Sequence, residues 1–477
     1  MSERALSPAL PWPGPRAWRM AAMLPVSDIR AEIACVVALV PILLLVALWN
    51  GFPITFFDTG AYVLQGLAFK FIPERAASYS LFLRFMDIRE SLWLAAAAQS
   101  LLSAFVIVQF ARAQRPGLPS WQVVALGFGL VFLTGAGWYI GQIEPDCFTP
   151  LAAIALYLLT FKLRELGSAR AAAVAVIGAF AVSAHPSNLG MAAGLAFSIA
   201  VAAIIASRFR GTTVPEIAVK WPLAAFTGGV GIVLACNFAL TGQVFLSRSG
   251  PVFFTARLIQ DGVVKRVLDD DCATAHFRLC AFRDALPPTA DDWLWADDSS
   301  FNKLGRFKGM EAESQQLVRE SLTHYPLQVV TRSLWNGLDQ FAMFRTGDGV
   351  GPQRREQNWL FAGFLRSQQI EYLRARQEAG GFPLLAINVV HVGLATLALA
   401  ILAFAAWHAF RRRDWRALAL PAFVLLALAC NAFVCGAISG PHDRYQGRMI
   451  WIAPLTVALL PRDELRKILK ARQAAAR

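Results

Sequence analysis

Acidic residues lie in two of the short segments that separate long apolar runs of this chain. Asp58 stands in Phe-Phe-Asp-Thr-Gly-Ala-Tyr soon after the first apolar run, and Glu144 and Asp146 stand in Ile-Glu-Pro-Asp-Cys. A carboxylate among aromatic side chains at a membrane surface is partly desolvated, which makes it a competent proton acceptor when a hydroxyl is presented to it. We therefore expect Asp58 to be a catalytic base and Glu144 and Asp146 to be further catalytic carboxylates.

Each acidic residue also has a purely structural interpretation. Asp58 precedes Thr-Gly and suits the N-cap of a short helix, and Asp146 suits the N-cap of the next apolar helix. Glu144 and Asp146, held by Pro145, could instead bind a divalent cation or orient an acceptor molecule. No Cys and His spacing resembles a zinc site, so the sequence leaves only this divalent cation open as a cofactor.

Two arginines precede the last apolar run, in Ser-Gly-Pro-His-Asp-Arg-Tyr-Gln-Gly-Arg. Arg444 and Arg448 are four residues apart, so on a helix they project from one face, where two guanidinium groups could bind a phosphate. Lipid head groups or Asp443 are the alternative partners of these arginines. We expect Arg444 and Arg448 to bind substrate together with the neighbouring His442 and Tyr445.

Two further side chains complete the expected site. Tyr62 follows Asp58 by four residues, so a helix places both on one face. His185 lies in a tight turn between two apolar runs, where an ionisable residue usually faces a protein cavity rather than lipid. A structural turn histidine fits that position equally well. We expect Tyr62 and His185 to contact substrate.

The elements that position these residues are membrane helices. The chain has 477 residues, of which 56% are hydrophobic and 16% are charged, and its mean hydropathy is +0.47. These values are far from those of a soluble domain and indicate an all-α polytopic membrane protein. The net charge of +13 could suggest nucleic-acid binding, but the basic residues are spread over short loops, where they set membrane topology instead. Membrane lipids are therefore expected partners, and nucleic acid is not.

We predict about ten transmembrane helices, because one crossing takes about 20 apolar residues. Lys and Arg concentrate in alternate gaps between the apolar runs, which places those gaps and both termini in the cytoplasm. The predicted helices begin near Ala31, Leu92, Trp121, Thr149, Ala171, Asn188, Pro222, Phe382, Leu418 and Met449. The basic residues of the cytoplasmic side are Arg16, Arg19, Arg30, Arg112, Arg115, Lys162, Arg164, Arg170, Arg208, Arg210, Arg411, Arg412, Arg413 and those of the C-terminal tail.

The predicted helices and gaps divide the chain into five parts. Within the N-terminal membrane region, residues 50–91 form a first outer loop that alternates apolar, aromatic and charged residues and suits short interfacial helices. The five parts are a cytoplasmic segment (1–30), the N-terminal transmembrane region (31–240), a mostly helical periplasmic domain (241–381), C-terminal transmembrane helices (382–460) and a cytoplasmic basic tail (461–477).

Cysteines do not form a disulfide scaffold, because four of the seven fall in predicted membrane helices. Cys272 and Cys280 differ, since both lie in the predicted periplasmic domain with seven residues between them. An oxidising compartment would allow them to pair. We therefore predict a disulfide between Cys272 and Cys280.

This layout resembles the GT-C superfamily, membrane glycosyltransferases that use polyprenyl-phosphate-linked sugars. The resemblance lies in an Asp in a first outer loop, a second acidic loop, a large outer segment and Arg-Tyr-Gln-Gly-Arg before the final helix. It implies Asp58 as general base or acceptor-binding group, with inverting transfer of the sugar to an envelope glycan or lipid acceptor on the outer face of the bacterial inner membrane. Many members carry an Asp-Glu pair, whereas Asp58 is followed by Thr59, so Glu144 or Asp146 could share the role.

Two other classes of protein stay open. A non-catalytic subunit of an envelope polysaccharide system would need none of these side chains for chemistry. A lipid or polysaccharide transporter would also be polytopic, but it should carry polar residues through the middle of its helices, and these helices are mostly apolar with small residues for packing. Loss of transfer activity on replacing Asp58 would separate an enzyme from both classes.

Overall fold

The computed structural model describes residues 26–208 and 215–460. The secondary structure of these residues is helical, with no strand among them, and Ile54 and Gln142 form an isolated bridge. Seven of the helices are long and apolar enough to cross a membrane. The predicted all-helical class is therefore confirmed for the described residues, and the apolar helices support a membrane protein. The expected cytoplasmic arginines at 16, 19 and 210 and the basic tail lie outside the described residues.

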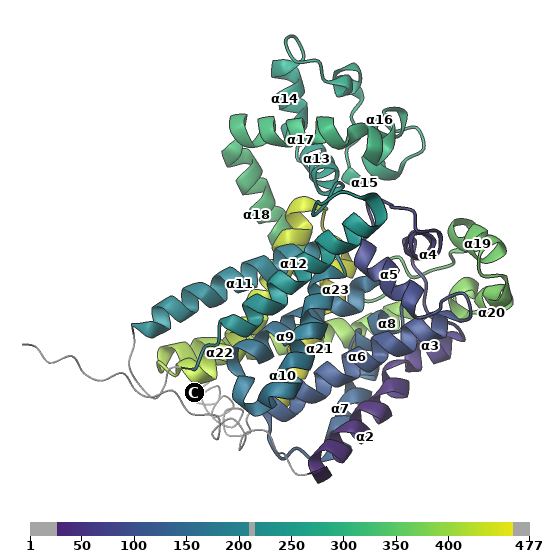
Figure 1. Cartoon of the computed structure of the whole chain (residues 1–477). Coiled ribbons are helices and arrows are strands. Elements are labelled where there is room, and N and C mark those ends of the chain that lie inside the picture. The colour runs from purple at the N-terminus through teal and green to yellow at the C-terminus, as the bar shows by residue number, and fades with distance from the viewer. Residues whose placement is uncertain (1–25, 209–214, 461–477) are drawn as a thin grey trace, which may run out of the picture.

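The candidate spans gather in one bundle (Figure 1). In the first span, Pro41 lies inside α2 (Val26–Leu43), where proline removes a backbone hydrogen bond, and the chain restarts after Leu44 as α3 (Leu45–Asn50). The other six spans are α6 (Leu92–Gln114), α10 (Leu163–Ser183), α11 (Pro186–Ser207), α12 (Lys220–Thr241), α21 (Leu384–Arg411) and α22 (Trp415–Ile438).

Three of the ten expected transmembrane helices do not reach spanning length. α7 (Ser120–Leu133) and α9 (Phe148–Phe161) have 14 residues each, or about 21 Å of helix against a hydrocarbon layer of about 30 Å. The helix expected near Met449 is divided at Trp451 into α23 (Asp443–Ile450) and α24 (Ile452–Leu459), because α23 carries polar residues of the site described below. Among the described residues seven helices are long enough to cross a membrane, so the expected count of ten is not confirmed.

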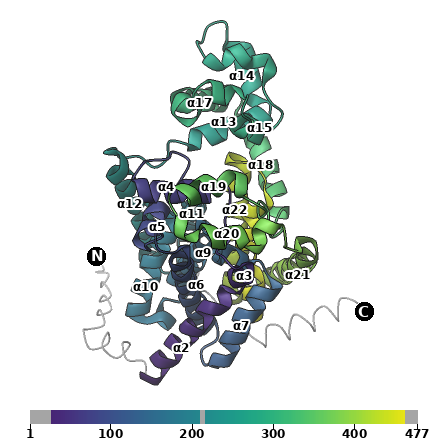
Figure 2. The same cartoon turned by 90° about the vertical axis from the view of Figure 1, so that its right-hand side faces the viewer.

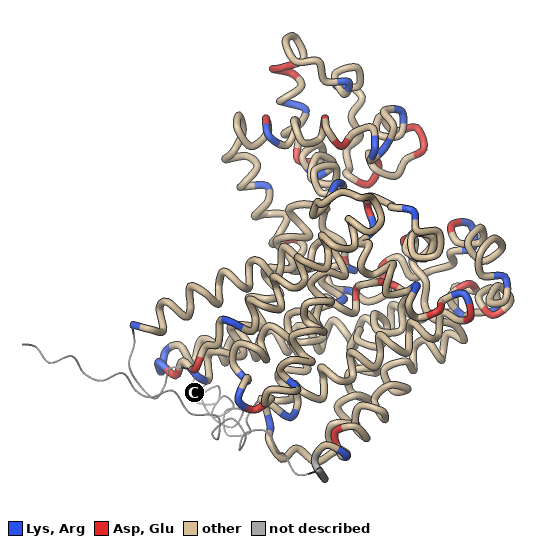
Figure 3. The backbone as a smooth tube through the Cα atoms, in the orientation of Figure 1, with Lys and Arg blue, Asp and Glu red and all other residues tan. Residues whose placement is uncertain are grey.

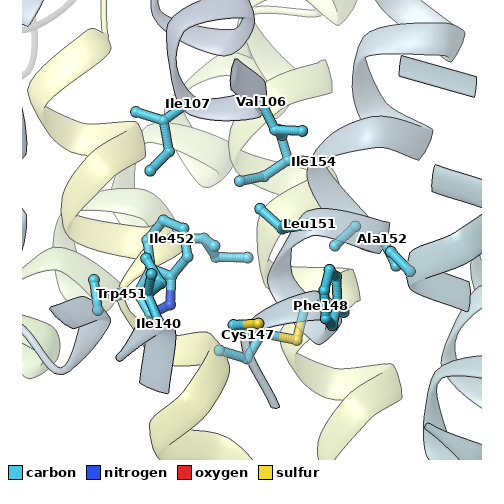
Figure 4. Packing of buried hydrophobic residues seen from close by; sticks show 14 of the residues in the cluster. Val106, Ile107, Ile140, Cys147, Phe148, Leu151, Ala152, Ile154, Trp451 and Ile452 are labelled. Atoms are coloured by element: carbon cyan, nitrogen blue, oxygen red, sulfur yellow. The ribbon is translucent and has the colours of Figure 1, made fainter. Parts of the chain in front are cut away.

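An apolar core fills the bundle beneath the acidic segment 144–146. Figure 4 shows Phe148 and Leu151 of α9 on one side of this core and Ile140 of α8 (Ala136–Ile140) and Trp451 on the other, with Cys147 between them. These side chains are at most 1% exposed. Cys147, the last residue of the short 3-10 helix η1 (Pro145–Cys147), belongs to the same core. The acidic segment is therefore attached directly to the buried core of the bundle.

The first outer loop contains two short helices, α4 (Thr59–Ala68) and α5 (Ala77–Phe85), where interfacial helices were expected. They pack against each other, and α5 also packs against α12. Tyr79 and Leu83 are fully buried. These helices therefore cover the end of the bundle and are part of its core instead of lying only on lipid.

The segment 241–381 divides into two parts. Most of it stands above the bundle in Figure 1 and has a core of its own around Trp293 and Phe301, whereas its last helices bury Phe361 and Tyr372 in the core of the bundle. Figure 2 shows these last helices beside α4. The helices of the upper part are α13 (Gly250–Gln260), α14 (Val263–Asp271), η2 (Arg278–Ala285), α15 (Ala290–Trp295), α16 (Ser300–Lys303) and α17 (Arg306–His324). The connecting and last helices are α18 (Pro326–Ala342), α19 (Arg354–Gly363), η3 (Arg366–Gln368), α20 (Gln369–Arg374) and η4 (Arg376–Ala379).

A disulfide joins Cys272, which follows α14, to Cys280 in η2. The remaining cysteines of the described residues are free, and Cys35, Cys147 and Cys435 are buried. The bridge closes a short loop at the edge of the upper part, as the spacing of the two cysteines predicts.

Charged residues lie mainly at the two ends of the bundle and in the upper part, and most of the bundle between them is uncharged (Figure 3). We call the end next to α13–α17 the domain end and the opposite end the basic end. At the basic end Arg170 pairs with Glu32 at 2.7 Å and Arg164 pairs with Glu216 at 2.8 Å. Arg444 and its partners lie at the domain end. The helices thus separate the charges into two groups, as the alternation of charged gaps predicts.

Candidate functional site

Arg444 of α23 lies among the three predicted catalytic carboxylates. Its Nε lies 2.5 Å from Asp146 Oδ2, and its Nη2 lies 3.1 Å from Glu144 Oε2. Its Nη1 lies 3.4 Å from Asp58 Oδ2. The structure therefore brings together Asp58, Glu144, Asp146 and Arg444 from three distant parts of the sequence, and we call this group with Arg75 and Arg448 the arginine–carboxylate cluster.

Arg448, one helical turn after Arg444, is completely buried. Its Nη1 lies 2.8 Å from Asp146 Oδ1, and its Nη2 donates to Ser187 Oγ at 2.7 Å and to Asn431 Oδ1 at 3.4 Å. These partners all belong to the protein, and the side chain has no exposed surface. The expected phosphate site made by both arginines therefore does not fit Arg448, which holds Asp146 in place instead.

Asp58 is the exposed edge of the cluster. Its side chain is 26% exposed, whereas those of Glu144 and Asp146 are completely buried. Arg75 Nη2 donates to Asp58 Oδ1 at 2.5 Å, so two guanidinium groups hold its two oxygens. Asp58 stands at the N-cap position of α4, but its side chain makes no capping hydrogen bond there. The carboxylate is therefore available for a role other than capping.

Backbone hydrogen bonds fix the first outer loop against the acidic segment. The Ile54 N–H donates to Gly141 O at 3.0 Å, and the Ile143 N–H donates to Ile54 O at 2.9 Å. Beside this contact, Thr59 Oγ1 donates to Glu144 Oε1 at 3.2 Å. These bonds place the start of α4 beside Glu144, which explains how two separate segments supply one cluster.

The acidic segment owes its shape to Pro145. Proline suits the first position of η1, because its fixed φ matches a helix start and no N–H is needed there. Asp146 then lies inside η1, and Cys147 occupies the N-cap position of α9. Capping of α9 is thus not the role of Asp146, whose carboxylate points to the two arginines.

Burial raises the pKa of Glu144 well above its ordinary value, and the neighbouring Arg444 opposes this shift. Burial therefore favours the neutral form of Glu144, and its contact with Arg444 favours the ionised form.

Tyr62 and His185 support the cluster from its sides. The Tyr62 ring is buried, packs edge-on against Tyr79 at 5.1 Å and lies under the Arg75 guanidinium at 5.7 Å. His185 Nδ1 accepts from the Ser187 N–H at 3.2 Å and caps α11. Burial and the neighbouring Arg448 lower the pKa of His185, which favours the neutral ring that capping requires. Both residues therefore adjoin the cluster, and His185 has the structural turn role that the sequence left open.

His442 and Tyr445 turn away from the carboxylates. His442 Nε2 lies 3.3 Å from Asp291 Oδ2 of α15, so it connects α23 to the upper part of the chain. The Tyr445 hydroxyl lies 3.1 Å from Ser439 Oγ. The structure thus places both near the expected site without bringing either to Asp58.

Several site residues were missed from the sequence. Arg75 is an arginine in an outer loop and could have been found by the argument that identified Arg444. Asn431 is a polar residue inside the apolar span α22, which is also a signal. Phe56, whose ring centroid lies 3.8 Å from Arg444 Cζ, gives no signal of its own among so many aromatic residues.

The geometry does not favour a cation at Glu144 and Asp146. Guanidinium nitrogens occupy the positions beside both carboxylates. Within the described part of the chain, a group with metal-binding side chains is found instead in the upper part, at Asp271, Glu320 and His324.

The comparisons with known proteins found no matching family model, no matching curated protein and no matching solved structure.

Proposed function

We propose that this protein is an inverting membrane glycosyltransferase that transfers a sugar from a polyprenyl-phosphate donor to an envelope glycan or lipid acceptor. The observation that carries the proposal is a single exposed carboxylate, Asp58, at the edge of an otherwise buried cluster of arginines and carboxylates. Buried charges cost several kcal/mol each to desolvate. The cluster contains six charged side chains, and solvent reaches it mainly at the Asp58 carboxylate. This arrangement supports a chemical role for Asp58.

In the proposed reaction, Asp58 accepts the proton of the acceptor hydroxyl as its oxygen attacks the anomeric carbon. The bond between that carbon and the donor phosphate oxygen breaks, and the phosphate leaves with the electron pair. Arg75 and Arg444 lie on either side of Asp58 and stabilise the negative charge of the leaving phosphate. Asp146 and Glu144 orient Arg444, and Arg448 orients Asp146.

An apolar cavity supports a lipid-linked donor. It has a volume of about 250 Å³, lies between α7, α21 and α24, and extends to Thr134 at the end of α7. Gly135 follows Thr134 and lies close to Gly447 of α23, one residue before Arg448. The first isoprene units of a polyprenyl donor in this cavity would therefore have their phosphate near the cluster.

The proposal includes an orientation in which the domain end faces the periplasm and both termini face the cytoplasm of a bacterial cell. Its test is labelling of intact cells with a membrane-impermeant thiol reagent, followed by mass analysis of the peptides with Cys272 and Cys280. Labelling that requires mild reduction, but no membrane disruption, agrees with this orientation. Labelling only after disruption of the membrane contradicts it and the mechanism together.

The activity itself is tested with purified protein in proteoliposomes and a panel of polyprenyl-phosphate sugars. The acceptor is identified by comparing the lipids and glycans of cells with and without the protein, resolved by mass. Transfer that depends on Asp58 supports the enzyme. A glycan difference in cells that persists with Asp58→Asn would instead favour the non-catalytic subunit or transporter.

A further inference from the structure

One face of α18 carries an exposed apolar stripe. Leu327, Val330, Leu334 and Leu338 recur at intervals of three and four residues, so they lie on one side of the helix. They are between 54% and 78% exposed. Nothing in the described chain covers them, and a contiguous exposed apolar patch of this kind marks a contact with another protein or with membrane.

The neighbouring face of α18 packs against the candidate span α22. A Cβ added at Gly337 would lie 3.2 Å from Phe433 Cα, and one added at Gly436 would lie 2.3 Å from Asn336 O. Small residues therefore let the two helices touch along their backbones. Because Phe433 and Gly436 belong to the last turns of α22, α18 lies beside the domain-end half of a membrane span.

The apolar stripe is continuous with exposed apolar side chains of that span. Phe433 and Ile438 of α22 are also exposed, at 45% and 40%. The opposite flank of α18 carries the exposed residues Arg332, Trp335 and Asp339. By helical spacing this polar flank and the stripe lie on different sides of the helix. Such a division, with Trp and Arg at the border, is typical of a helix that lies in a membrane interface.

We propose that α18 lies in the lipid layer at the domain end of the bundle, with Leu327, Val330, Leu334 and Leu338 among lipid acyl chains. The occupant is membrane lipid because the stripe extends the exposed surface of a span. A second copy of the chain or another protein would have to displace lipid from α22 as well. Arg332 and Asp339 then face water and head groups.

This contact bears on the cluster through Gln340, on the packing face of α18. Its Nε2 donates to His442 O at 2.8 Å, and its Oε1 accepts from the His442 N–H at 2.9 Å. The same residue therefore fixes the chain two residues before Arg444. Lipid around α18 would hold this part of α23 in position, whatever reaction the cluster performs.

The test uses the full chain in vesicles of phosphatidylethanolamine and phosphatidylglycerol. The photoreactive residue benzoylphenylalanine replaces Leu334 in one variant and Asp339, on the polar flank of the same helix, in the matched control. After illumination, intact mass analysis identifies the partner of each adduct. We expect abundant lipid adducts in the variant at position 334 and far fewer in the variant at position 339.

Two results would overturn the proposal. Adducts of position 334 with a second copy of the chain or another protein would make the stripe a protein interface. Equal lipid labelling at both positions would mean that lipid surrounds both sides of α18. No lipid labelling at either position would mean that α18 lies outside the bilayer. The intact Cys272–Cys280 disulfide and the elution volume of each variant check that the upper part is folded.

Discussion

The two ends of the helical bundle contain the same types of charged residue in opposite surroundings. At the basic end, Arg164 and Glu216 pair while 83% and 66% exposed. At the domain end, Arg448 and Asp146 pair with no exposure at all. Exposed pairs are screened by solvent and contribute little to stability, whereas a buried pair is strongly destabilised when one partner is removed. The difference shows that burial, and not residue type, sets how much each of these two pairs contributes to stability.

The largest effect expected from this comparison is that of Asp146→Asn. It leaves the buried Arg448 without its carboxylate, and loss of one partner of a buried pair costs about 3 to 5 kcal/mol. We expect a large drop in the unfolding temperature of the detergent-solubilised protein or loss of folded protein. Glu216→Gln removes an acidic partner at the other end and should leave that temperature unchanged. Equal stability of the two variants would contradict the distinction between the ends.

The second effect is on activity at the exposed edge of the cluster. Asp58→Asn keeps the size of the side chain and removes its basicity, so sugar transfer should fall by about 100-fold. Because Asp58 is partly exposed, the unfolding temperature should fall less than in Asp146→Asn. Glu74→Gln, in the same loop, is the matched control and should transfer normally. Normal turnover by Asp58→Asn would remove this residue from the role of base.

The convergence of the acidic residues and Arg444 was predictable from their positions at one side of the apolar runs. Because these residues lie in gaps on the same side of the membrane, they must gather at one end of the bundle. Few other polar residues at that end are available to pair with them. Which of them is buried and which is exposed was not predictable, because burial depends on the tertiary packing of distant helices. Helical spacing gives Arg444 and Arg448 the same face, but α22 and the start of α11 cover only Arg448.

The difference between the ten expected spans and the seven long helices has a related reason. Hydropathy identifies apolar runs, but it does not show where a helix begins. In the span expected near Thr149, the 3-10 helix η1 occupies the first turn before α9. In the last expected span, the polar helix α23 precedes α24. In both places the residues of the cluster replace the turns that would have completed a span. The expected spans and the observed helices therefore differ where residues of the cluster interrupt a regular helix.

The third effect depends on whether Arg444 acts through the geometry of its guanidinium group or only through its positive charge. Arg444→Lys keeps the charge but cannot contact Asp58, Glu144 and Asp146 together, so we expect the KM for the donor to rise by roughly 10-fold. Arg345→Lys changes an exposed arginine near the same end and should leave the KM unchanged. Donor titrations of both variants measure this difference. An unchanged KM for Arg444→Lys would exclude the proposed phosphate contact.

The smallest effect concerns the contact between the cluster helix and the upper part of the chain. The hydrogen bond that His442 donates to Asp291 raises the pKa of His442, although burial opposes it, and the same bond lowers the pKa of Asp291. Asp348 also raises the His442 pKa, and Arg444 lowers it. The contact is therefore strongest when His442 is protonated and Asp291 is ionised.

The sign of the pH dependence follows from these two shifts. The stabilisation from His442 is complete below the ordinary histidine pKa and is lost as the pH rises through the raised one. The stabilisation from Asp291 is lost as the pH falls through its lowered pKa. Both groups are more than one-third exposed, so the effect on global stability is small. A histidine-resolved NMR titration should show a lower midpoint for His442 in Asp291→Asn than in Asp292→Asn, which changes the neighbouring carboxylate. Identical midpoints would mean that Asp291 does not hold His442.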